Sequence, residues 1–264
     1  MFFHARIFFH SLIFLGILEF ISLDFVSSNL AFLSARNFFL ASLGFLVLIV
    51  YFYQVAKKVS GSFSLTPISV FFAAGSLGLL YFIQAHWEQN CFIVICAFVY
   101  YFIHLALYRL HLYRKDKTAL GILSAGNTAT IFLIYAVTYG IYLNFAISLW
   151  FLMTVILLCT TLISFQYFLL VGENKMLMLS YALILGFIMA EIFWVLSFWP
   201  FGYLTTGVAG LIFYFVFWDI IQCHFSQKLS KRRIVFNLVF LSILVTVVLS
   251  SARWLPVVLL YLHF

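Results

Sequence analysis

Charged residues are scarce in this sequence of 264 residues. Lys, Arg, Asp and Glu together make up 8% of it, whereas 66% of the residues are hydrophobic and the mean hydropathy is +1.18. A single soluble core of this length could not bury so much apolar surface, so the composition excludes an ordinary soluble domain. We therefore expect an all-α polytopic transmembrane helix bundle that forms one integral membrane domain over residues 1–264.

Motifs for catalysis and for metal binding are also missing. The four cysteines form no CxxC pair and lie in or beside apolar segments, which argues against a zinc site or a disulfide framework. The sequence contains no GxSxG, no HExxH and no P-loop, and no predicted span carries the lysine that a retinal Schiff base requires. We predict no metal and no cofactor, and the sequence favours a role other than catalysis.

Long apolar runs fill the chain instead. A helix needs about 20 apolar residues to cross the hydrocarbon core of a bilayer, and windows of that length mark nine segments. The connections between them are short and leave no room for a soluble domain. The nine predicted spans cover residues 8–26, 38–56, 67–84, 91–109, 120–143, 146–169, 177–199, 203–222 and 234–253.

The basic residues predict the orientation of these spans. A net charge of +7 would suggest nucleic acid binding in a soluble protein, but here the charge follows the rule that Lys and Arg stay on the cytoplasmic side. Nine spans place all basic residues except Arg36 and Arg253 on the side of the N-terminus. We predict a plasma (inner) membrane protein with the N-terminus inside, the C-terminus outside, the lipid bilayer as its partner and no nucleic acid. The predicted inner residues are Arg6, Lys57, Lys58, Arg109, Arg114, Lys115, Lys117, Lys175, Lys228, Lys231, Arg232 and Arg233.

A carboxylate inside the seventh span, Glu191, is the leading candidate for a binding residue. An ionisable group near the bilayer centre costs roughly 2.5 to 3.5 kcal/mol on insertion scales, so it normally faces a bundle interior and has a partner. Arg253, near the outer end of the last span, is the predicted partner. Helical rise puts Glu19 of the first span about 10 Å, and Glu191 about 13 Å, below the outer ends of their spans. His86 lies above them in an outer turn.

The seventh span has two different faces. Ala182, Gly186 and Ala190 recur every four residues and predict a narrow face that another helix can approach closely. At about 100° per residue, Glu191 lies on another side, which it shares with bulky and aromatic residues. Trp194 is the candidate binding residue among them. The residues on that side are Ile184, Phe187, Trp194 and Phe198.

Other polar residues in the spans have ordinary structural explanations. Asp219 lies near the inner end of the eighth span, where we expect an ion pair with Lys228 or with the basic cluster at residues 231–233. His104, in the fourth span, is expected to be an interior histidine whose hydrogen bonds are satisfied. Asn127 is expected to bond between helices.

The last three spans resemble an uncharacterised family of bacterial multi-pass membrane proteins. The similarity lies in Ala190-Glu-Ile-Phe-Trp-Val-Leu-Ser-Phe-Trp-Pro200, in the basic turn at residues 231–233 and in Ser251-Ala-Arg-Trp254, and it covers about a third of the chain. The Glu-x-x-Trp and Ala-Arg-Trp elements are its specific parts. The resemblance implies an integral membrane protein with no assigned activity, and it transfers no functional residue.

Three functional classes fit the sequence. The favoured one is a structural or assembly protein with a buried polar cluster in the outer half, which would bind partner subunits in the membrane. A small-solute or proton-coupled transporter is the alternative. The Gly-containing stretch at residues 73–78 suits transport, but no inverted repeat is visible. The third is an enzyme acting on a lipid-linked substrate with Glu191 or Glu19 as general base, although the short outer loops leave little room for a catalytic domain.

Overall fold

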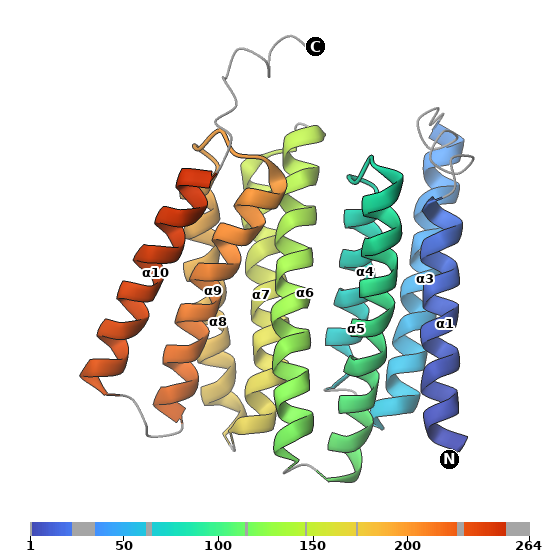
Figure 1. The fold of residues 1–264 in the computed structure, drawn as a ribbon, viewed down its shortest axis with the longest axis horizontal. Helices are drawn as coiled ribbons and strands as arrows, with labels where there is room; N and C mark the ends of the chain where they lie inside the picture. The colour runs from blue at the N-terminus through green and yellow to red at the C-terminus, as the bar shows by residue number, and fades with distance from the viewer. Residues whose placement is uncertain are drawn as a thin grey trace. The chain divides into compact units, whose positions relative to one another are not determined.

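The computed structural model describes residues 2–22, 35–61, 65–113, 116–145, 147–172, 174–225 and 230–251, with side chains from residue 4 in the first range and from residue 44 in the second. These ranges contain nine α-helices (Figure 1). The helices are α1 (Phe2–Ser22), α3 (Ala35–Ser60), α4 (Pro67–Leu80), α5 (His86–Leu112), α6 (Lys117–Asn144), α7 (Leu149–Val171), α8 (Lys175–Leu196), α9 (Tyr203–Phe225) and α10 (Lys231–Ser251).

Each predicted span overlaps one of these helices, which confirms the all-α fold. Seven of the helices, α1 and α5 to α10, are long and apolar enough to cross a membrane. Contacts between residues divide the chain into two compact units, residues 1–130 and residues 131–264, and α6 crosses the boundary between them. One integral membrane domain over the whole chain stays a prediction.

Helix α4 is shorter than the sequence predicted. It begins at Pro67, where a proline is tolerated because the first helical N–H has no partner within the helix. It ends at Leu80, four residues before the predicted end. Its 14 residues give a length of about 21 Å at 1.5 Å per residue, against about 30 Å for a bilayer core. Residues 81–85 continue without helix, and the side-chain amide of Gln89 donates to the Ile83 carbonyl at 2.7 Å.

The core of the first unit is built around Tyr100. Within this unit α1, α3, α4 and α5 alternate in direction (Figure 1). Tyr100 of α5 stacks on Phe14 of α1 with ring centroids 4.3 Å apart. Phe52 of α3 and Phe72 of α4 complete the cluster at 6.0 and 6.4 Å. All four side chains are buried, so one aromatic ring from each helix joins the unit through apolar contact.

Small residues let the helices of the second unit approach closely. Gly186 of α8 lies against α7, where an added Cβ would meet Thr161 and the Leu157 carbonyl oxygen. This confirms the predicted contact face, since Ala182 and Ala190 are buried beside it. Helix α10 differs from the others because none of its described residues is buried, and among the described helices it packs chiefly on α9.

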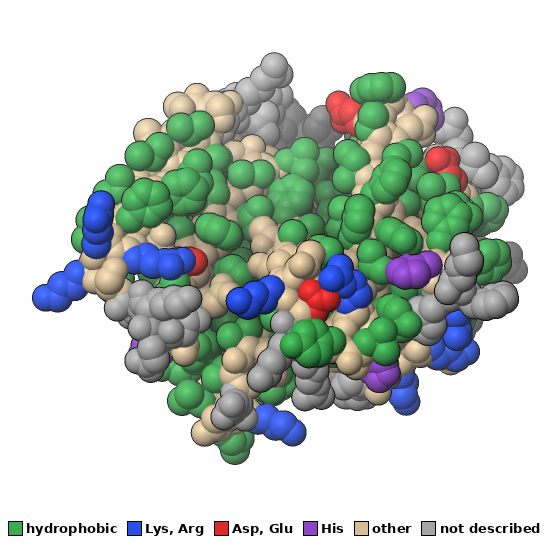
Figure 2. Space-filling view, turned by 60° about the horizontal axis from the view of Figure 1, so that its bottom comes forward, with side chains coloured by type: hydrophobic (Ala, Val, Ile, Leu, Met, Phe, Trp, Pro, Cys, Tyr) green, Lys and Arg blue, Asp and Glu red, His purple; other side chains and the backbone are tan. Residues whose placement is uncertain are grey.

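Basic side chains lie at one end of the helices in each unit. In the first unit Lys57 and Lys58 are in the last turn of α3, Arg109 is in the last turn of α5, and Lys117 begins α6. In the second unit the basic residues begin α8 and α10. Figure 2 brings this end forward and shows Lys and Arg side chains around it, with hydrophobic side chains covering the flanks of the helices.

Candidate functional site

Glu191 lies on an exposed side of α8. Its neighbours at helical spacing are exposed and apolar, with Phe187 57% and Trp194 46% accessible. The opposite side of α8 is buried against α7 at Gly186. The structure therefore corrects the expectation that Glu191 belongs to a buried polar cluster. Helical periodicity correctly predicted which neighbours share this side, but the surface that they form faces outward from the other helices of the second unit.

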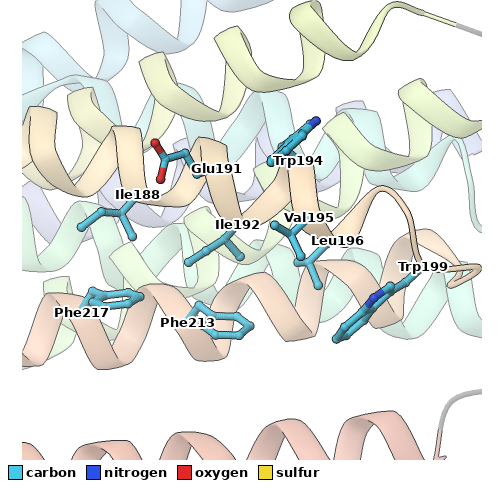
Figure 3. Close-up of a pocket in the computed structure, with 9 residues that line it drawn as sticks. All are labelled: Ile188, Glu191, Ile192, Trp194, Val195, Leu196, Trp199, Phe213 and Phe217. Atoms are coloured by element: carbon cyan, nitrogen blue, oxygen red, sulfur yellow. The ribbon is translucent and has the colours of Figure 1, made fainter.

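The carboxylate sits at the rim of an apolar groove between α8 and α9. The groove has a volume of about 630 Å³, and Glu191 is the only ionisable residue among those that line it. In Figure 3 the Glu191 and Trp194 side chains point away from α9, whereas Ile188 and Ile192 point towards it. The remaining lining residues are Val195, Leu196, Trp199, Phe213 and Phe217.

No hydrogen bond or ion pair is recorded for the Glu191 side chain among the described residues. Its predicted partner, Arg253, lies outside them. Helix α10, which ends two residues before Arg253, packs on α9, while the carboxylate points to the other side of α8 (Figure 3). The pairing of Glu191 with Arg253 stays a prediction.

The other candidate residues lie in the first unit. Glu19 is exposed near the end of α1, and its backbone carbonyl accepts a hydrogen bond from Ser22 at 2.7 Å. His86 is exposed and begins α5. The structure thus places Glu191 and Trp194 together on α8. The predicted similar depth of Glu19 and Glu191, with His86 above them, stays a prediction.

The sequence did not predict the hydrogen bonds that join buried hydroxyl groups in the interior of the second unit. The Tyr135 and Thr160 hydroxyls bond at 2.8 Å between α6 and α7, and those of Ser164 and Tyr214 bond at 3.1 Å between α7 and α9. All four side chains are buried. The glycine at position 210 was the available signal in the sequence, because Gly210 of α9 leaves room first for the Phe193 ring and then for the Tyr135 ring. These bonds are typical of helix association in membranes.

A polar contact also links the C-terminal end of α5 to the start of α6. Asp116 receives a hydrogen bond from the Arg109 guanidinium at 2.8 Å and lies just before α6. Its other oxygen accepts from the N–H groups of Thr118 and Ala119 at 3.0 and 3.1 Å, so it caps the helix. These N–H groups, the Ala119 N–H foremost, lower the pKa of Asp116, and Arg109 lowers it further.

A family model described as "Protein of unknown function (DUF5656)" matches residues 10–251. The chain belongs to the DUF5656 family. The match covers nearly the whole chain, including Glu191 and all of α4 to α10, and it confirms that the chain belongs to an uncharacterised family. Comparison with curated proteins and with solved structures finds no match. The DUF5656 family is uncharacterised, so membership assigns no activity to the exposed face of α8.

Proposed function

We propose that this protein is a multi-pass assembly subunit of a bacterial plasma membrane, and that the exposed face of α8 binds a helix of another subunit. The observation that carries the proposal is Glu191, an ionisable residue exposed within a helix of membrane-spanning length. Facing lipid, such a group is costly, and the cost falls when a neighbouring helix supplies a hydrogen-bond donor. We name the surface formed by Ile184, Phe187, Glu191, Trp194 and Phe198 the α8 face.

The proposed topology has nine crossings, the N-terminus inside and the C-terminus outside. The seven long apolar helices supply seven crossings and α3 supplies another, while α4 supplies the ninth together with the non-helical residues 81–85 that follow it. In support of this orientation, the described basic residues gather at one end of the helices in each unit. That end would face the cytoplasm.

The chemistry of the α8 face favours a different chain over a second copy as the partner. A two-fold contact through this face would bring two Glu191 carboxylates together, and like charges in a low dielectric repel. A partner helix with a Lys, Arg, Asn or Gln at the level of Glu191 would instead donate to the carboxylate. Trp194 and Phe187 would supply large apolar contacts on either side of that bond.

The position of Glu191 favours assembly over transport. A solute pathway normally runs between helices of the bundle, with its ionisable residues facing the interior. Glu191 instead lies on the outer side of α8, and the groove beside it is lined by apolar side chains.

A photo-crosslinking amino acid at Phe187 tests this proposal in intact membranes. We expect one protein adduct of defined mass, which should weaken in the Glu191→Leu variant and persist in Glu191→Gln, because the amide still forms hydrogen bonds. The same amino acid at Phe20, an exposed position of α1, is the matched control and should give no such adduct. Crosslinks to lipid alone would reject the assembly role, and an adduct of two identical chains would reject a different partner.

A further inference from the structure

A buried histidine in the first unit has one ring nitrogen in use and one without a recorded partner. His104 of α5 is 1% exposed. Its Nδ1 atom lies 3.0 Å from the Tyr100 carbonyl oxygen, and because a carbonyl can only accept, Nδ1 carries the proton of this bond. In the neutral ring Nε2 then holds a lone pair and can only accept. The structure records no hydrogen bond to this buried Nε2 atom from the described residues.

The buried hydroxyl of Ser69 on α4 also has no recorded hydrogen-bond partner among the described residues. The Ser69 side chain is fully buried. Several helical hydroxyls donate to the carbonyl four residues before them, as Ser76 does to Phe72 at 2.8 Å. A buried polar group without a partner is rare in native proteins, and ordered water is a common explanation.

The register of α4 against α5 brings these two residues to one level. The helices are antiparallel, and the ring centroids of Phe72 and Tyr100 lie 6.4 Å apart. Ser69 comes three residues before Phe72, and His104 comes four residues after Tyr100. At 1.5 Å per residue both therefore lie about 5 Å from that contact in the same direction. The offsets also keep each residue close to the face that makes the contact.

A second contact supports the register. The Cys96 thiol of α5 interacts with the Ser76 hydroxyl of α4. Ser76 comes four residues after Phe72, and Cys96 comes four residues before Tyr100. The pairs of residues that face each other thus follow the regular spacing of two antiparallel helices.

We propose that Ser69 and His104 bind one water molecule between them. The water donates a hydrogen bond to Nε2 of His104 and forms a second bond with the Ser69 hydroxyl, so that both buried groups are satisfied. The site lies among apolar rings, because Phe72 and Tyr100 close it on the side towards the centre of the unit. A single small neutral molecule that both donates and accepts matches these two groups.

The water gives the Nε2 lone pair of His104 a hydrogen-bond donor, and no proton is transferred. Among the titratable groups on the other helices of this unit, Tyr51 of α3 and His10 of α1 have side chains that lie 3.4 Å apart. The positive charges of Arg6 and Lys58 interact electrostatically with His10. The proposed water site lies between α4 and α5 and is independent of Glu191 and of the α8 face.

Magic-angle-spinning NMR of the full-length protein in lipid bilayers, with ¹⁵N-labelled histidine, tests the site. The spectrum of His104→Gln identifies the His104 signals by difference. We expect a protonated Nδ1, an unprotonated Nε2 and transfer of magnetisation from water protons to Nε2. The transfer should fall at least about threefold in Ser69→Ala and stay unchanged in Ser76→Ala, the matched control on the same helix.

Several results would overturn the proposal. The first is the absence of water transfer to Nε2, and the second is undiminished transfer in Ser69→Ala, since the water would then not be shared. The third is transfer to Nε2 from the Ser69 hydroxyl alone, which would mean that the two side chains bond directly. The Ser69→Thr variant keeps the hydroxyl and should retain the water signal, so it replaces Ser69→Ala if that variant fails to fold.

Discussion

The Nη2 atom of Arg233 lies 2.9 Å from Oδ1 of Asp219 and joins the start of α10 to the end of α9. The Arg233 Nε atom reaches Oδ2 at 3.4 Å, and Asn237 donates to the same oxygen at 2.8 Å. This confirms the prediction that Asp219 pairs with the basic cluster at residues 231–233. Because α10 has no buried residue in its described length, these contacts are a principal link between α10 and α9.

Removing the Asp219 carboxylate should loosen α10. The ion pair is partly exposed, with the Arg233 side chain 46% accessible, so solvent screening keeps its contribution to stability small. Asp219→Ala should therefore speed amide exchange along α10 and leave α7 and α8 unchanged. Lys231→Gln is the control, since it removes a charge from the same turn for which no ion pair is recorded. Equal exchange in both variants would contradict this role.

The nine helices were predictable because each coincides with a long apolar window, but their ends were not. The apolar run continues through Tyr81, Phe82 and Ile83, although α4 stops at Leu80. Windows of hydropathy measure side chains and take no account of backbone hydrogen bonds. For this reason a hydropathy window does not show that α4 ends at Leu80.

The site was predictable only in part. Periodicity showed which residues share a side with Glu191, since that depends on α8 alone. Whether this side faces a neighbour depends on how α8 packs, and packing involves residues far apart in the sequence. The pairing of Ser69 with His104 likewise requires the register of α4 against α5, which no local pattern contains.

Opposite ends of α5 should be accessible from opposite sides of the membrane. Its 27 residues make a helix of about 40 Å, enough to separate Glu88 in its first turn from Lys117 beyond its last. Single cysteines introduced there into a cysteine-free variant should react differently with an impermeant maleimide in intact cells. We expect labelling of Glu88→Cys from outside, and of Lys117→Cys only after the membrane is opened. Labelling of both from the same side would reject the topology.

Acid should weaken the start of α6 through Asp116. Its folded pKa is lowered, so the stabilisation is fully present above the unfolded value of about 3.9 and is lost as the pH falls through the folded value. Amide protection at Thr118 and Ala119 should decline below about pH 4 relative to other α6 amides. Asp116→Asn, which can still accept at the cap, should remove this pH dependence. A profile identical to that of the parent chain would exclude Asp116 as its source.

An added methyl group at Gly186 should separate α7 from α8. Its Cβ would lie 2.9 Å from the Leu157 carbonyl oxygen, and backbone cannot move aside as a flexible side chain can. We expect Gly186→Ala to lower the free energy of unfolding by about 1–3 kcal/mol, as overpacking typically does. Gly16→Ala is the control, because open space surrounds that position in α1. The control should be neutral or slightly stabilising, and equal losses would contradict the close approach.

The partner of Glu191 can be identified by a double-mutant cycle with Arg253 in the purified chain. The sequence predicts that these two residues pair, whereas the proposed α8 face assigns the carboxylate to another subunit. If the partner is another subunit, Glu191→Gln should change the thermal unfolding of the isolated chain little, since the side chain is exposed and has no recorded bond to the described residues. The effects of Glu191→Gln and Arg253→Gln should then add within about 0.5 kcal/mol. A pair within the chain would behave differently, because removal of one charge leaves the other unpaired. Each single variant would then lose more thermal stability than the double variant. That outcome would confirm the predicted ion pair and reject an α8 face completed by another protein.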